Sequence, residues 1–201
     1  MMSYRLFAIV CFLLITPDMY GRDPISGDRY ELLSGVKIDD GYKYSGITDG
    51  DLKRSAPAKF LAESYYHIPK GGKILDISLR DGKNAVFLSR KGFNVSGLDI
   101  SSESIKKATA LAFEFGVDIN FIQKSVYKFD PGKKSLDAII CFYFERMDLI
   151  PRLMSWLKPG GVLILEGRGE WLKLFKDHRI VKYEESGIGE KNRSSIIVKK
   201  R

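Results

Sequence analysis

The sequence predicts an α/β fold. Short apolar runs suited to buried strands alternate along the chain with segments whose apolar residues follow helical spacing. Glycine and proline clusters separate these segments, as at Pro69–Gly72 and Lys158–Gly161. With 201 residues, 44% of them hydrophobic and 29% charged, the chain is long enough for one ordinary domain and can bury a core.

Each expected element has a local signal. The expected strands cover residues 73–78, 94–100, 119–125, 136–144, 162–166, 179–184 and 195–199. The expected helices run from 57 toward the break at 69 and over 82–91, 101–116, 148–157 and 170–175. Gly92 ends the second helix and Ser101 begins the third. Because strands that alternate with helices pair in parallel, the predicted architecture is a Rossmann-like three-layer sandwich. Its seven-stranded sheet is mostly parallel and closes with a C-terminal antiparallel hairpin.

The composition limits the kinds of partner. Lysine and arginine total 33 and acidic residues 25, which gives a net charge of +8. The basic residues are spread out, without the aromatic and basic stacking pattern of single-strand binders, so nucleic acid is not an expected partner. Two cysteines (Cys11 and Cys141) and two histidines (His67 and His178) provide neither a disulfide framework nor a metal centre.

The first residues resemble a targeting segment. Arg5 precedes ten apolar residues, Leu6–Ile15, and then Thr16–Gly21. The apolar run is too short for a membrane span, which takes about 20 residues, and it fits a secretory signal peptide over residues 1–21. A buried or uncleaved N-terminal helix is the alternative. Use of the leader would make the protein exported or periplasmic, and otherwise it would be cytoplasmic.

Two parts of the chain resemble a known family. Residues 73–92 (KILDISLRDGKNAVFLSRKG) and 95–101 (VSGLDIS) are similar to the nucleotide loop of class I S-adenosylmethionine-dependent methyltransferases. Cys141–Arg146 and Leu157–Ile164 are similar to later blocks of that family. The nearest likeness is to the tellurite-resistance and thiopurine-type branch, which acts on small molecules. The resemblance implies a methyltransferase-like domain over residues 57–201, with residues 22–56 as a lead-in or lid.

The resemblance also implies S-adenosylmethionine as the cofactor and places its site after the first four strands. The implied cofactor-binding residues are Asp76, Ser78, Arg80, Gly82, Asp99, Ile100, Ser125, Val126, Cys141 and Tyr143. Asp99 is expected to accept hydrogen bonds from the ribose hydroxyls, and Ser125 from the adenine amino group. No catalytic base is identified: Tyr143, Glu145 and Arg146 are candidates by position only. Cys141 is expected to pack within its strand rather than act as a nucleophile, because no base lies near it in sequence.

The cofactor loop departs from the family pattern, which reads acidic-x-Gly-x-Gly-x-Gly. Ser78 and Arg80 stand at the first two glycine positions, and only Gly82 remains. The Arg80 stem would occupy space expected for methionine and ribose. Its charge would repel the sulfonium by roughly 3 kcal/mol at ~6 Å and an effective dielectric constant of ~20. Alternatively, Arg80 pairs with the methionine carboxylate or another anion, or it turns outward into solvent.

The segment after Glu166 is short. Only Gly167, Arg168 and Gly169 separate the fifth strand from the next helix, which predicts an open substrate pocket. The first functional hypothesis is methyl transfer from S-adenosylmethionine to a small nucleophile such as a thiol, chalcogenide or amine. The alternative is a catalytically degenerate methyltransferase fold, exported if the leader is used, that binds another ligand or a protein.

Overall fold

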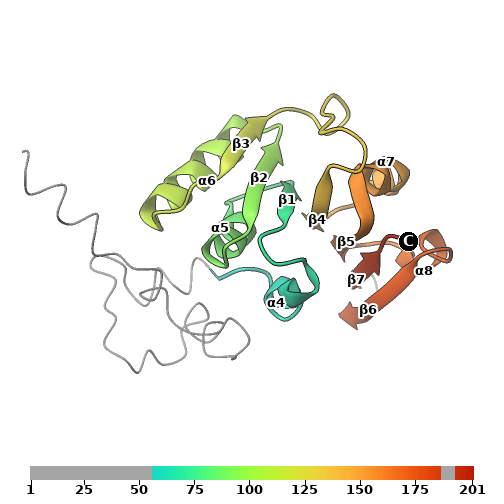
Figure 1. The fold of residues 1–201 in the computed structure, drawn as a ribbon. Coiled ribbons are helices and arrows are strands. Elements are labelled where there is room, and N and C mark those ends of the chain that lie inside the picture. Colours follow the sequence, from blue (N-terminus) through green and yellow to red (C-terminus); the bar gives the residue numbers. More distant parts are fainter. Residues whose placement is uncertain (1–55, 187–192) are drawn as a thin grey trace, which may run out of the picture.

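A seven-stranded mixed sheet forms the centre of the protein (Figure 1). The computed structural model describes residues 56–186 and 193–201. The predicted leader over residues 1–21 and all of the lead-in except residue 56 lie outside the described residues. The strand order is β3-β2-β1-β4-β5-β7-β6. Pairing is parallel from β3 to β5 and antiparallel from β5 through β7 to β6, which confirms the predicted fold class.

The elements follow the predicted order with adjusted ends. The strands are β1 Lys73–Ile77, β2 Asn94–Asp99, β3 Asn120–Gln123, β4 Leu136–Phe142, β5 Leu157–Gly167, β6 Arg179–Ser186 and β7 Arg193–Lys199. The α-helices are α4 Lys59–Ala62, α5 Lys83–Arg90, α6 Ser102–Glu114, α7 Ile150–Trp156 and α8 Trp171–Leu174, with single 3-10 turns η2 at Tyr65–His67 and η3 at Met147–Leu149. The predicted first helix is therefore only one α-helical turn followed by a 3-10 turn. Ser101 caps α6 as expected, since its hydroxyl accepts a hydrogen bond from the Ser104 amide at 3.2 Å.

The helices cover both faces of the sheet, and each face has its own apolar cluster. On one face, Phe60, Phe87 and Ala108 from α4, α5 and α6 pack against Ile140 and Ile164. On the other, residues of α7 and α8 pack against the intervening strand residues, among them Ile139, Cys141, Leu163 and Leu165. This alternation along β4 and β5 is the two-residue period of a strand buried on both faces.

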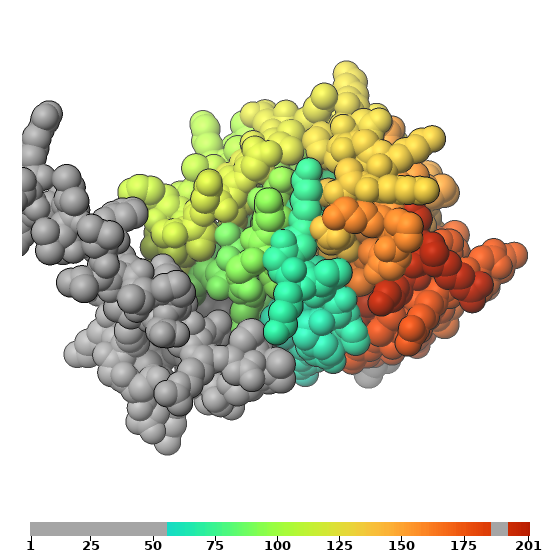
Figure 2. Space-filling view, viewed as in Figure 1, coloured from blue at the N-terminus to red at the C-terminus, as the bar shows by residue number. Residues whose placement is uncertain are grey.

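The short helix α4 joins the two halves of the domain. In the space-filling view, the turquoise residues near 56–75 lie between the green α5–α6 region and the orange-red C-terminal part (Figure 2). The Lys182 ammonium on β6 lies 3.8 Å from the Glu63 carboxylate and 4.9 Å from the centre of the Phe60 ring. These contacts fix the first described helix against the last strands of the sheet.

The cluster Lys158–Gly161 lies inside a strand, contrary to prediction. We expected it to separate a helix from a strand beginning at Val162, but β5 begins at Leu157. A register shift opposite Leu136 and Ala138 accommodates the extra residues, and Gly160 supplies the left-handed backbone (φ +76°). The Gly160 amide and Gly161 carbonyl both bond to the backbone of Lys200, so this irregular stretch keeps its hydrogen bonds.

Lys200 stabilises the C-terminal end of α7. Its ammonium donates to the carbonyls of Met154 and Leu157, both at 2.6 Å, which satisfies acceptors that have no partner within the helix. We expect Lys200→Met to lower the free energy of unfolding by about 1–2 kcal/mol, measured by urea denaturation. The exposed Lys176→Met is the control and should change it by less than about 0.5 kcal/mol. Equal effects of the two substitutions would contradict this role.

Among the described residues, no helix is long and apolar enough to cross a bilayer. Within the same residues, no three histidine, cysteine or acidic side chains gather closely enough to hold a metal ion.

Candidate active site

The carboxyl ends of β1, β2 and β4 meet at one edge of the sheet. β1 pairs with β2 on one side and with β4 on the other, so the chain winds in opposite directions from β1. In open parallel sheets this reversal point opens a crevice for a ligand. The predicted site residues lie in the last part of these strands or in the segments after them, apart from Ser125 and Val126, which follow the neighbouring strand β3.

The loop after β1 keeps a glycine-like backbone without the glycines. Ser78 and Arg80 have φ of +65° and +57°, in the left-handed region that side chains disfavour by about 1 kcal/mol or more. Leu79 between them is buried and packs where Gly97 of β2 has no side chain, because a Cβ there would lie 2.6 Å from its methyl carbon. The Ser78 amide also donates to the Leu98 carbonyl at 3.0 Å. These contacts fix the turn, while the side chains of Ser78 and Arg80 are exposed.

Gly82, the retained glycine, has a packing role. Its φ is +80°, and an added Cβ would lie 2.5 Å from the Ala108 methyl group. Gly82 begins α5 and Ala108 lies in the middle of α6, so the absent side chain lets the two helices approach closely. No other residue fits this position without moving α6.

Asp76 on β1 is a buried carboxyl group beneath this loop. It is 2% exposed, and its Oδ2 has no hydrogen-bond partner among the described residues. Burial raises its pKa well above 3.8, the negative charges of Asp99 and Asp81 raise it further, and a hydrogen bond from the Ala85 backbone opposes the shift. An unsatisfied buried acceptor is costly, which makes this atom available to a donor on a ligand.

Asp76→Asn should change the pH dependence of stability. Because the pKa of Asp76 is raised in the folded state, the wild type retains its full stability below about pH 4 and loses part of it as the pH rises through the raised pKa. We expect the variant, which lacks this titration, to gain stability relative to the wild type over that rise. Urea denaturation of both proteins from pH 4 to pH 8 measures the difference. A difference that does not vary with pH would contradict the assignment.

Asp99 ends β2 and holds the start of the next segment. One carboxylate oxygen accepts from the Ser101 amide at 2.9 Å, and the other from the Arg80 amide at 3.4 Å. Each oxygen has further lone pairs, so ribose hydroxyls can still donate to it. The next residue, Ile100, is 70% exposed and presents an apolar surface beside this carboxylate. An exposed isoleucine at this place suits contact with a flat base.

Ser125 and Val126 follow β3. The Ser125 hydroxyl accepts from the Tyr127 amide at 3.4 Å, so this oxygen takes part in a local turn and keeps one lone pair for another donor. Val126 is half-buried and packs against the second apolar cluster. The two residues retain the positions expected of an adenine-binding segment, and their role stays a prediction.

Cys141 and Tyr143 differ sharply in exposure. Cys141 is fully buried, and desolvation followed by the charge of Asp76 raises the pKa of its thiol well above 9.0. This agrees with a packed strand residue, so we leave its side chain out of the proposed cofactor contacts. β4 ends at Phe142, one residue earlier than the predicted contact at Tyr143. Tyr143 has φ of +59° and is 47% exposed.

Two arginines pack on the Tyr143 ring. The guanidinium carbon of Arg80 lies 4.3 Å from the ring centre, and that of Arg193 lies 4.5 Å from it. Arg80 is therefore directed toward β4. Arg193, at the start of β7, was not predicted, since no sequence signal links it to residue 143. Only the antiparallel return of β7 beside β5 brings it here.

A second unpredicted cluster joins the loops after β3 and β4. The Tyr127 hydroxyl donates to Asp148 at 2.9 Å, and Arg146 donates to the same carboxylate at 3.1 and 3.2 Å. Hydrogen bonds from Arg146 and then Tyr127 lower the pKa of Asp148, and the partner Asp148 raises the pKa of Arg146. Arg146 is thereby removed as a candidate base, because it stays a cation.

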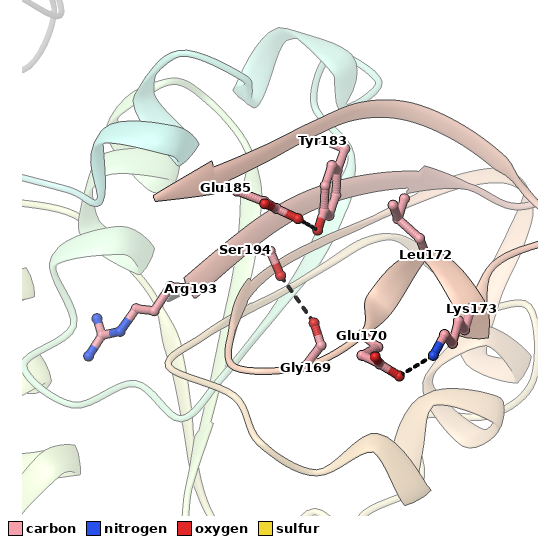
Figure 3. Close-up of a pocket in the computed structure, with 8 residues that line it drawn as sticks. All are labelled: Gly169, Glu170, Leu172, Lys173, Tyr183, Glu185, Arg193 and Ser194. Atoms are coloured by element: carbon pink, nitrogen blue, oxygen red, sulfur yellow. Dashed lines mark hydrogen bonds and ion pairs between the residues drawn. The ribbon is translucent and has the colours of Figure 1, made fainter. Parts of the chain in front are cut away.

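A cavity of about 320 Å³ lies beyond the carboxyl end of β5 (Figure 3). Its lining includes Gly169 and Glu170 from the short loop, Lys173 from α8, and Ser194 from β7. Glu170 faces Lys173, with oxygen and nitrogen 2.6 Å apart, and Ser194 donates to the Gly169 carbonyl at 3.2 Å. The cavity lies where the short segment after Glu166 predicts an open pocket.

The sequence and structure comparisons agree with this geometry. A family described as "Methyltransferase domain" matches residues 74–161. The chain is 35% identical over 98 residues to a ubiquinone biosynthesis O-methyltransferase of Rickettsia conorii, covering 46% of this chain and 34% of that protein. It is 28% identical over 178 residues to a carboxy-S-adenosyl-L-methionine synthase of Wolinella succinogenes, covering 79% and 73%. The crystal structure of TehB from Haemophilus influenzae has a TM-score of 0.63 and 15% identity, covering 76% of this chain and 65% of that one.

The fold, the loop after β1 and these relatives define a methyltransferase domain. These comparisons support a member of the class I S-adenosylmethionine-dependent methyltransferase family, whose cofactor is S-adenosylmethionine. The chain spans about a third of the length of the R. conorii relative. Its likeness to TehB shows the fold alone, so the branch within the family stays a prediction.

The residues present fit this cofactor. The Asp76 oxygen without a partner among the described residues can accept a hydrogen bond from the ligand. Asp99 can still accept hydrogen bonds from the ribose hydroxyls, and Ile100 offers an apolar surface to the base. Ser78 and Arg80 both follow the glycine-like backbone path, and Arg80 adds a charged side chain whose end packs on Tyr143.

Proposed function

We propose that this protein transfers a methyl group from S-adenosylmethionine to a small-molecule nucleophile. The observation that carries the proposal is the left-handed backbone of Ser78 and Arg80 beside Asp99, which keeps the shape of the cofactor loop although two glycines are replaced. The names of the relatives support the same activity. The alternative of a non-catalytic binding module finds no support among the relatives named above.

Each residue at the edge of the sheet has a role in this proposal. Asp99 accepts hydrogen bonds from the ribose hydroxyls, and Ile100 with Val126 borders the adenine. Asp76 accepts from a donor of the methionine part or from an ordered water. When bound, S-adenosylmethionine supplies an electrophilic methyl group on a sulfonium sulfur. The protein contributes chiefly by holding the acceptor in line with that group, since alignment alone accounts for large rate effects.

The acceptor enters from the side of β5. The cavity next to the segment 168–170 is large enough for a small molecule, and it lies at the same sheet edge as Tyr143. The O-methyltransferase names among the relatives favour a hydroxyl oxygen as the attacking atom, with thiols and amines as further classes. Glu145, a candidate base by position, is exposed to solvent after β4, and no contact with a described residue directs it toward the cavity. A nucleophile that ionises readily therefore suits the site best.

The test incubates the full chain with S-adenosylmethionine and, separately, a catechol, an aliphatic thiol and a primary amine. We expect time-dependent release of S-adenosylhomocysteine, measured by mass spectrometry, with at least one class. At a cofactor concentration below saturation, Asp99→Ala should lower the rate by up to about 100-fold, and Asp130→Ala, which alters an exposed turn at the Gly132 amide, should not. Failure of the folded wild type to bind the cofactor or to release product with any class would refute the proposal.

A further inference from the structure

We propose that Arg80, Tyr143 and Arg193 form a recognition site for a carboxylate on the methyl acceptor. The inference rests on the proposed function and adds a substrate class to it: a small organic anion. It also assigns a role to Arg80, which replaces a glycine in the cofactor loop: its side chain would bind the acceptor rather than merely obstruct the cofactor.

The three residues come from three separate elements. Arg80 lies in the loop after β1, Tyr143 follows β4, and Arg193 begins β7. Both guanidinium carbons lie within 4.5 Å of the centre of one ring, so the two cations are at most about 9 Å apart. The ring limits where the two guanidinium groups can sit, which makes them a positioned pair rather than two independent surface charges.

The pair lacks a counter-ion in the part of the chain that the structure describes. Neither Arg80 nor Arg193 takes part in a salt bridge there, and the guanidinium group of neither donates a hydrogen bond to a described residue. Two like charges near one ring repel each other, and an anion within reach of both guanidinium groups would be attracted to both. Arginine suits a carboxylate particularly well, because its fork can donate two parallel hydrogen bonds.

A second cluster in the same protein combines an arginine, a tyrosine and a carboxylate. Arg146 lies 5.0 Å from the centre of the Tyr127 ring, and the Asp148 carboxylate accepts hydrogen bonds from both residues. Arg80 and Arg193 present two cations and one tyrosine without such a carboxylate among the described residues. By this comparison, the missing member of the cluster around Arg80 and Arg193 is a carboxylate carried by the ligand.

The position of this three-residue cluster in the sheet favours binding of the methyl acceptor over binding of the cofactor. Arg193 lines the cavity beyond β5, and Figure 3 shows its guanidinium group turned away from that cavity's other labelled side chains. Its strand, β7, is separated from β1 by β4 and β5, on the side of the sheet away from Asp99 and β2. A carboxylate bound on Tyr143 would therefore lie between the cofactor loop and the cavity, where the acceptor has to sit.

The test uses benzoate as the probe and benzamide as its uncharged match. Each is titrated into the full chain saturated with S-adenosylhomocysteine, and affinity is followed by NMR. We expect benzoate to bind at least about tenfold more tightly than benzamide. Arg193→Gln and Arg80→Gln should each weaken benzoate binding by about fivefold or more, with circular dichroism confirming the fold. The control Arg179→Gln alters an exposed arginine at the start of β6 and should leave the affinity unchanged.

Three results would overturn the proposal. They are equal affinity for the two probes, benzoate affinity unaffected by Arg193→Gln, and the absence of benzoate binding up to roughly 50 mM. A fourth would reassign the site to the methionine carboxylate of the cofactor: benzoate competing with S-adenosylhomocysteine, together with a loss of that ligand's affinity in Arg193→Gln. None of these results bears on the proposed function, which is tested separately by cofactor binding and by product release from the unmodified chain.

Discussion

Arg80→Gly should tighten the binding of S-adenosylmethionine by about tenfold, equivalent to ~1.4 kcal/mol. The substitution removes a cation near the sulfonium and a side chain from the cofactor loop. Direct repulsion at an effective dielectric constant of ~20 would give roughly 3 kcal/mol, but Arg80 is exposed, and water reduces this by about half. Calorimetric titration of both proteins measures the effect.

Two matched measurements separate charge from volume in that result. Arg80→Gln keeps the side-chain stem and removes the charge, and S-adenosylhomocysteine keeps the nucleoside and lacks the sulfonium charge. If repulsion dominates, the glutamine variant gains nearly as much affinity as the glycine variant, and S-adenosylhomocysteine gains less. Little change in stability is expected with Arg80→Gly. Relief of the left-handed backbone at φ +57° is offset by the greater freedom of glycine in the unfolded chain. Unchanged affinity in both variants would show that Arg80 does not face the cofactor.

Among the substitutions considered, Asp99→Ala should cause the largest loss of affinity for S-adenosylmethionine, by roughly 100-fold. A carboxylate that accepts hydrogen bonds from two ribose hydroxyls gains about 1.5–3 kcal/mol from each bond. Part of this gain is lost because the carboxylate and the hydroxyls give up their hydrogen bonds to water. The substitution also frees the amides of Ser101 and Arg80, so the loop loses two contacts at once. Calorimetry gives the affinity, and Asp99→Asn should lose less because it keeps one acceptor.

The control for that loss is Asp130→Ala. Asp130 likewise accepts a backbone hydrogen bond, from Gly132 at 2.9 Å, but in the loop that leads into the amino end of β4. It should bind the cofactor as the wild type does. If Asp99→Ala stays within about threefold of the wild type, the carboxylate does not contact the ribose and acts only as a local cap.

Most of the fold could be predicted because its signals are local. The apolar runs of β1, β4 and β5 are buried on both faces, and the breaks around them carry glycine or proline. The prediction for Lys158–Gly161 was wrong because the same residues that interrupt a helix also fit a bulged strand. The strand forms because this segment pairs with Leu136 and Lys200, which lie far away in sequence.

The site could be predicted only where it follows a motif. The loop residues Ser78 and Arg80 were found because they replace expected glycines, but their left-handed backbone depends on Leu79 packing against Gly97. Arg193 had no such signal, since its contact with Tyr143 exists only through the antiparallel placement of β7. Long-range contacts of this kind are absent from any window of sequence.

The central claim is that the edge formed by β1, β2 and β4 binds S-adenosylmethionine although Ser78 and Arg80 occupy glycine positions. Calorimetric titration of the unmodified full chain with S-adenosylmethionine tests it most directly. We predict one saturable site with an affinity in the micromolar range, displaced by S-adenosylhomocysteine. No saturable binding by the folded wild type up to roughly 1 mM cofactor would contradict the claim, and binding by Arg80→Gly alone would show that Arg80 blocks the site.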